Sequence, residues 1–257
     1  MNRIDKLFEK ETNGVLSIYF TAGYPNLNDT VPIIKSLEKN GVKLIEIGIP
    51  FSDPMADGAV IQTSGSKALK NGMTLKILFN QLSTVRELVQ IPLVLMGYLN
   101  PIMQFGFDEF CAEAKRCGVD GVIIPDLPFE EYLESYKSIA EAHNLHMIML
   151  ITPETSDDRI RLIDKHTGGF IYMVSTASVT GVRSSFGEDN LSYFKRVNAM
   201  NLKNPRMIGF GISNKATFDA ACDNASGAII GSKFVSLLEN EKTIDGAVAK
   251  LIEAIKQ

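Results

Sequence analysis

The sequence lacks the residue clusters that mark metal sites and disulfide scaffolds. Its 257 residues include only three cysteines and three histidines, with no Cys-x-x-Cys pair and no array at the spacing of metal ligands. The cysteines, odd in number, are Cys111, Cys117 and Cys222. We therefore expect reduced thiols and no metal site.

Charge excess and long apolar runs are missing as well. The formal net charge is −4, without the basic excess of a nucleic-acid-binding protein. No apolar run approaches the roughly 18 residues that suggest a membrane span. The first ten residues contain no hydrophobic signal core and are typical of a short amphipathic helix. The expectation is a cytoplasmic protein that binds neither nucleic acid nor a membrane.

Linkers and low-complexity stretches are absent, and short apolar runs alternate with amphipathic segments along the whole chain. The runs predict eight buried strands, at 15–20, 44–47, 93–96, 122–124, 146–150, 170–174, 207–210 and 228–230. Eight strand–helix units predict an α/β fold, a single (β/α)8 TIM barrel over residues 1–257 with an extra N-terminal helix. A doubly wound open sheet is the alternative, which the lack of a Gly-x-Gly-x-x-Gly turn after the first strand disfavours.

The segments between the strands carry apolar residues at helical spacing. Helices are predicted at 28–40, 108–117, 129–143 and 157–166, with start signals at Ser156 and at Ser213-Asn214. In a barrel of this kind, chemistry belongs to the loops that follow the strands.

One carboxylate interrupts the apolar second strand. Because strand residues alternate between faces, the isoleucines on either side of Glu46 pack against the helices, and Glu46 points into the barrel. A structural ion pair is one explanation, since a buried charge needs a partner. The following loop, residues 50–58, adds Asp53 and Asp57, which an Asx turn and a helix cap would also explain.

Taken together, these residues form a distinctive motif. Glu-Ile-Gly-Ile-Pro-Phe-Ser-Asp-Pro-Met-Ala-Asp-Gly at 46–58 resembles the signature of tryptophan synthase alpha subunits almost residue for residue. The likeness continues in order through Phe-Thr-Ala-Gly-Tyr-Pro at 20–25, Leu-Met-Gly-Tyr-Leu-Asn-Pro at 95–101, Val-Asp-Gly-Val-Ile-Ile-Pro-Asp-Leu-Pro at 119–128 and Gly-Phe-Gly-Ile-Ser at 209–213. It covers essentially the whole chain.

The resemblance implies a lyase that cleaves indole-3-glycerol phosphate to indole and glyceraldehyde 3-phosphate by a retro-aldol reaction without a cofactor. It implies Glu46 as general acid and base, Asp57 as the partner of the indole N–H, and Tyr172 near Glu46. Burial should raise the pKa of Glu46, and Tyr172 could equally be an ordinary core residue. Thr180 corresponds to the residue that hydrogen-bonds the loop aspartate.

The substrate's phosphate and ring need further sites. No lysine-bearing phosphate loop is present, so backbone N–H groups after the seventh and eighth strands are expected to hold the anion. The candidates there are Gly211, Gly231 and Ser232, and Gly181 joins them by resemblance. Side chains that match the family's indole pocket, although core packing explains any one of them, are Tyr19, Met96, Tyr98, Ile123 and Phe210.

The sequence departs from the family pattern at three positions. Ser178 and Ala59 replace a common glycine and a common proline, and Tyr19 stands where phenylalanine is frequent. These changes bear on closure of the lids at 50–58 and 182–189 and on affinity, while Glu46 and Asp57 are retained.

The family also implies a partner, a pyridoxal-phosphate-containing beta subunit, in an alpha2beta2 heterotetramer. It would dock at the barrel mouth near Asp53, Asn100 and Pro101. Three alternatives remain at this point: a stand-alone indole-producing lyase, another phosphate-binding barrel such as an isomerase or epimerase, and a non-catalytic chain that activates a partner.

Overall fold

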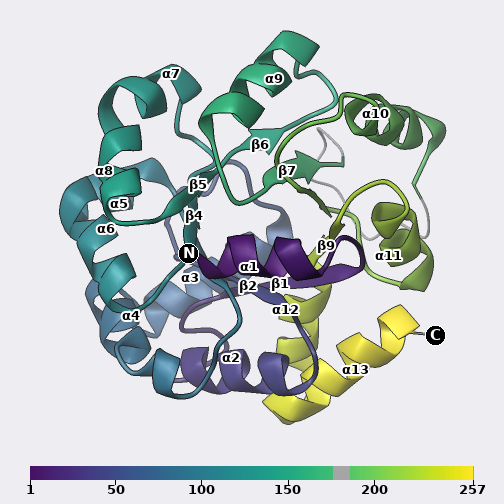
Figure 1. Cartoon of the computed structure of the whole chain (residues 1–257). Helices are drawn as coiled ribbons and strands as arrows, with labels where there is room; N and C mark the ends of the chain where they lie inside the picture. Colours follow the sequence, from purple (N-terminus) through teal and green to yellow (C-terminus); the bar gives the residue numbers. More distant parts are fainter. Residues whose placement is uncertain (176–185, 257) are drawn as a thin grey trace.

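Parallel strands form one barrel-shaped sheet inside a ring of helices (Figure 1) in a computed structural model that describes residues 1–175 and 186–256. The strand order around the barrel is β5-β4-β3-β2-β1-β9-β8-β7-β6. The strands are β1 (Val15–Thr21), β2 (Leu44–Gly48), β3 (Leu93–Met96), β4 (Gly121–Ile123), β5 (His146–Ile148), β6 (Leu150–Ile151), β7 (Ile171–Val174), β8 (Arg206–Gly209) and β9 (Gly227–Ile230). The predicted TIM barrel is confirmed.

The fifth predicted strand is the place where the structure differs from the prediction. Residues 146–150 were predicted as one strand, but β5 pairs with β4 whereas β6 pairs with β7. Met149 lies between the two, and its carbonyl accepts a hydrogen bond from the Tyr172 N–H at 3.0 Å. Residues 146–148 of this extended segment therefore pair with β4, and residues 150–151 pair with β7. This change of partner closes the barrel.

Apart from the N-terminal helix, the helices follow the strands and cover the outside of the barrel. They are α1 (Arg3–Lys10), α2 (Thr30–Lys39), α3 (Ala59–Lys70), α4 (Leu75–Leu82), α5 (Leu99–Phe105), α6 (Phe107–Arg116), α7 (Phe129–Glu131), α8 (Lys137–Ala142), α9 (Asp157–His166), α10 (Glu188–Asn198), α11 (Lys215–Cys222), α12 (Ser232–Asn240) and α13 (Ile244–Lys256), with a 3-10 turn at Val85–Glu87 and a π turn at Tyr132–Tyr136. Within the described residues, none of these helices is long and apolar enough to cross a membrane.

Both predicted helix starts are confirmed. The Ser156 hydroxyl accepts a hydrogen bond from the Arg159 N–H at the start of α9, and Asn214 forms a capping box with Thr217 at the start of α11. The predicted helix over 129–143 is observed as α7, the π turn and α8 in succession.

Two apolar cores lie on the two faces of the sheet. Between sheet and helices, Ile45, Ile47 and Ile49 belong to the large outer core. Inside the barrel, Leu44 of the same strand joins a second cluster that includes Val94 and Ile123. The two faces of β2 thus separate as its alternating sequence predicts, and Glu46 belongs to the inner face.

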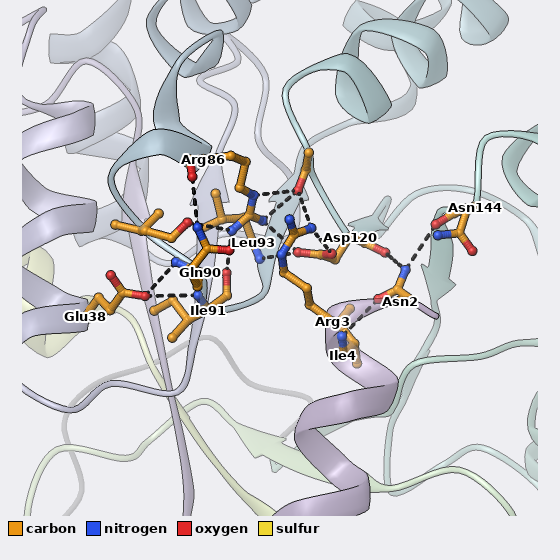
Figure 2. Close-up of polar contacts among 12 residues, drawn as sticks. Asn2, Arg3, Ile4, Glu38, Arg86, Gln90, Ile91, Leu93, Asp120 and Asn144 are labelled. Carbon is orange, nitrogen blue, oxygen red and sulfur yellow. Dashed lines mark hydrogen bonds and ion pairs between the residues drawn. The ribbon is translucent and has the colours of Figure 1, made fainter.

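Helix α1 covers the end of the barrel at which the strands begin (Figure 1). Its Ile4 belongs to the interior cluster, and Phe8 packs against Phe170 with ring centroids 6.1 Å apart. Figure 2 shows the polar contacts that fix this end. The Asp120 carboxylate accepts hydrogen bonds from Arg3 (3.1 Å) and Arg86 (2.8 Å). The end covered by α1 therefore stabilises the fold. In barrels of this kind the functional residues lie at the opposite end, where the strands finish.

Candidate active site

Glu46 lies in the middle of β2 and is fully buried, with 0% of its surface exposed. The sheet register places it between Tyr19 of β1 and Val94 of β3. Ser17 donates its hydroxyl hydrogen to Oε1 of Glu46 at 2.9 Å, whereas Oε2 has no hydrogen-bond partner among the described residues. Among the described residues, no cation contributes to the shift in its pKa. An ion pair with one of these residues therefore does not explain this carboxylate.

Burial makes Glu46 a weaker acid than an exposed glutamate. Desolvation disfavours the charged carboxylate and raises its pKa to about 8, and the hydrogen bond from Ser17 opposes this shift only in part. The group is thus largely protonated at neutral pH, and it can both give and accept a proton near neutral pH.

Asp57 lies in the loop between β2 and α3, where it is half-buried. Desolvation raises its pKa to about 6, and a hydrogen bond from the Tyr98 hydroxyl acts in the opposite direction. Tyr98 also accepts a hydrogen bond from the Ala56 N–H at 2.9 Å, and its ring packs on Phe51 with centroids 5.3 Å apart. Asp57 therefore remains largely ionised at neutral pH. Its loop is held in place by Tyr98, which lies just after the end of β3.

Most of the predicted pocket residues meet inside the barrel. Met96, Ile123 and Tyr172 belong to the interior cluster, and Tyr19 and Phe210 pack against it. Tyr172 and Phe210 make an edge-on ring contact with centroids 6.1 Å apart. Tyr98 is buried beside the Asp57 loop, outside this cluster. Together they form an apolar interior cluster with aromatic members around the Glu46 carboxyl group.

Two glycines make room for the phenol groups of this interior cluster. A Cβ atom at Gly48 would lie 2.1 Å from the Tyr19 hydroxyl, and one at Gly209 would lie 2.2 Å from the Tyr172 hydroxyl. Desolvation raises the pKa of both tyrosines, and the nearby charges of Glu46 and Asp57 add to the effect. Both phenols stay neutral and retain a hydrogen that they can donate.

The candidate phosphate site lies where β8 and β9 end. Gly231 is the N-cap residue directly before α12 and has no side chain to cap the helix, so the N–H groups of the first turn can bind an anion. Gly211 has a φ of +74°, a conformation that favours glycine. A Cβ atom at Gly231 would lie 3.5 Å from the Tyr19 side chain, so α12 begins beside the interior cluster. Ser232, the first residue of α12, is exposed.

Two of the predicted site residues, Thr180 and Gly181, lie outside the described residues, as does Ser178. The part of the predicted lid at 182–185 lies outside them too. Of the remainder, Phe186 is buried, and Gly187 precedes α10.

Comparison with known proteins extends these observations to the whole chain. The sequence profile of the family described as "Tryptophan synthase alpha chain" matches residues 6–257. The chain is 63% identical over 257 residues to the tryptophan synthase alpha chain of Parabacteroides distasonis and 61% identical over 256 residues to that of Bacteroides thetaiotaomicron, with 100% of each chain covered. The chain belongs to the tryptophan synthase alpha chain family.

A solved structure agrees with that placement. The tryptophan synthase alpha chain of Legionella pneumophila is 34% identical, with a TM-score of 0.88 over 100% of this chain and 97% of its own. The tryptophan synthase alpha chain family catalyses the alpha reaction of tryptophan biosynthesis, the cleavage of indole-3-glycerol phosphate. The resemblance to this family that the sequence indicated is therefore confirmed.

Two polar contacts around the site are not predictable from local sequence patterns. Ser17 was not expected to bind Glu46, although strand alternation places it on the same face as Tyr19. Asp126 was not expected to accept the Leu99 N–H at 2.9 Å. Both contacts join segments far apart in the sequence, so they depend on strand register and loop conformation.

Proposed function

We propose that this chain cleaves indole-3-glycerol phosphate to indole and glyceraldehyde 3-phosphate, with Glu46 as general acid and base and Asp57 as the anionic partner of the indole N–H. The observation that carries these roles is the contrast between the two carboxylates. Glu46 is fully buried with one oxygen unpartnered and a pKa of about 8, while Asp57 has a pKa of about 6. Neighbouring acids with separated pKa values suit separate roles in proton transfer.

The protonated Glu46 gives its proton to indole C3, which leaves positive charge on the ring nitrogen. The ionised Asp57 stabilises that charge through the indole N–H. The glycerol C3′ hydroxyl then loses its proton to the Glu46 carboxylate as the carbon–carbon bond breaks. The bonding electrons return to the ring, the products are indole and an aldehyde, and Glu46 is protonated again.

The interior cluster supplies the remaining binding interactions in this proposal. The apolar side chains of Met96, Ile123 and Phe210 hold the ring, and the neutral phenols of Tyr19 and Tyr172 border the reacting carbon. The phosphate binds the backbone amides at Gly211, Gly231 and Ser232. Thr180 and Gly181 join these groups by the family resemblance.

Membership of the family supports proposals about the cofactor and the partner of this chain. The family's alpha subunit does not itself need pyridoxal phosphate, and the family implies a beta-subunit partner. We propose that this chain works without a cofactor of its own, as one domain over residues 1–257, in the cytoplasm. We further propose that it docks in an alpha2beta2 heterotetramer whose beta subunit contains pyridoxal phosphate and consumes the indole.

Assay of the purified chain for indole release tests this function. Indole and glyceraldehyde 3-phosphate should appear in equal amounts from indole-3-glycerol phosphate, and turnover should survive a metal chelator. Release of no indole, with or without a beta subunit, would favour an isomerase, an epimerase or a non-catalytic role. Loss of turnover on chelation, restored by a defined metal, would contradict the cofactor-free reaction.

A further inference from the structure

A chain of contacts connects the loop after β4 to the loop that carries Asp57. At its outer end, the Asp126 carboxylate accepts a hydrogen bond from the Leu99 N–H at 2.9 Å. Leu99 is the first residue of α5, a helix whose preceding residue, Tyr98, provides no side-chain cap. Asp126 therefore satisfies one of the N–H groups that the start of a helix leaves without a partner.

The inner end of this chain of contacts is Tyr98. Its hydroxyl accepts a hydrogen bond from the Ala56 N–H at 2.9 Å, and its ring packs on Phe51. The same hydroxyl hydrogen-bonds the Asp57 carboxylate, a bond that lowers the pKa of Asp57 against the effect of burial. Tyr98 is only 6% exposed, so its ring is also held by packing. One phenol thus contacts three residues of the Asp57 loop.

We propose that Asp126 is a positioning residue for the cleavage reaction: by fixing the first turn of α5 it fixes Tyr98, and Tyr98 holds the Asp57 loop over the barrel mouth. We name these residues, Asp126, Leu99, Tyr98 and Ala56, the loop brace. Asp126 is exposed and has no part in the proton transfers, so it acts only through the other members. This inference rests on the proposed role of Asp57.

A charged acceptor suits the outer end of the brace. A carboxylate binds an N–H more strongly than a neutral acceptor does, and the positive end of the short helix adds to the attraction. Because Leu99 directly follows Tyr98, a shift of the first turn of α5 moves the tyrosine with it. A small displacement of a catalytic group is costly when it must meet a reacting atom at a fixed distance.

The matched variants are Asp126→Ala and Asp126→Asn. Alanine removes the acceptor, whereas asparagine keeps an oxygen in the same position. We expect Asp126→Ala to lower kcat by about threefold to tenfold, the equivalent of one hydrogen bond, with little change in KM. Asp126→Asn should restore kcat in part, to a value clearly above that of Asp126→Ala, since a neutral acceptor keeps about half the strength of a charge-assisted bond.

A double-mutant cycle identifies the route. If Asp126 acts through Tyr98, Asp126→Ala should have little further effect on kcat in a Tyr98→Phe background. Any of three results would contradict the loop brace. These are a wild-type kcat in Asp126→Ala, a kcat in Asp126→Asn no higher than in Asp126→Ala, and fully additive effects of Asp126→Ala and Tyr98→Phe.

Backbone amide exchange separates this inference from the proposed function. In the substrate-free protein, the Leu99 and Ala56 amides should exchange faster in Asp126→Ala than in the wild type or in Asp126→Asn. Unchanged exchange at both amides overturns the brace, whatever the kinetics. Full turnover in Asp57→Asn would instead remove Asp57 from its catalytic role, and the exchange of the two amides would still decide whether the brace exists.

Discussion

At the scale of single residues, the proposed site depends on a carboxyl group that is buried and that has no cationic partner among the described residues. Glu46 has one hydrogen bond, from Ser17, and its second oxygen faces no donor of the described chain. In a structural ion pair such an oxygen would have a partner. The arrangement fits a group that must exchange its proton with a substrate during each turnover.

The pH dependence of the reaction should report both carboxylates. Asp57 must be ionised, so kcat/KM should rise with pH through about 6. Glu46 must begin the reaction protonated, so kcat/KM should fall as pH rises through about 8. The alkaline limb is the diagnostic one, because a phosphate monoester also titrates near about 6. A profile that stays flat from pH 7 to 10 would contradict the role of Glu46.

Sequence alone could place Glu46 but not its partner. Period-two alternation along β2 fixes which residues face the interior, and the structure follows it. The bond from Ser17 requires knowledge of the register between β1 and β2, which sets Ser17 opposite Leu44 and Tyr19 opposite Glu46. Local patterns contain no information on that register.

At the scale of elements, the barrel places helix starts and strand ends side by side at its mouth. Residues Ala59 and Ser232 begin α3 and α12, each directly after a loop of the site. The capped starts of α9 and α11 were predictable because a cap is a local signal. The break of the fifth strand at Met149 was not, because it arises where one segment changes from one neighbour to the other.

The start of α12 should control phosphate recognition. A Cβ atom at Gly231 would make an ordinary 3.5 Å contact with Tyr19, so Gly231→Ala should be tolerated. Gly231→Val fills the space in front of the helix N-terminus and should raise KM for the phosphorylated substrate about tenfold or more, the equivalent of one or two hydrogen bonds. Binding of the dephosphorylated analogue, measured by calorimetry, should change little. Equal weakening of both ligands would make the residue structural.

At the scale of the whole molecule, the two ends of the barrel differ in character. The end covered by α1 is tied by Asp120 and its two arginines, whereas the mouth exposes Asp53, Asn100 and the side chain of Met55, which is 93% exposed. The closed end is suited to stability, and the mouth is suited to substrate and to a partner.

Binding of a beta subunit at the mouth should stimulate the lyase. A partner that favours the closed state of the loop at 50–58 aligns Asp57 and excludes water, and such coupling is typically about 5–150-fold. We expect Asp53→Ala to reduce this stimulation more than it reduces the activity of the isolated chain. The measurement is indole release with increasing amounts of beta subunit. Full activity of the isolated chain, unchanged by the partner, would point to a stand-alone lyase.

The most direct test of the account is indole release by Glu46→Gln. Glutamine keeps the shape of the side chain and can still accept the Ser17 hydrogen bond, but it cannot exchange a proton. We predict that kcat falls by about 100-fold to 10,000-fold or more, because one group serves both proton transfers. The circular dichroism spectrum should be unchanged, and substrate binding should be near normal. Turnover of Glu46→Gln close to that of the wild type would contradict the central claim that this buried carboxyl group carries the proton.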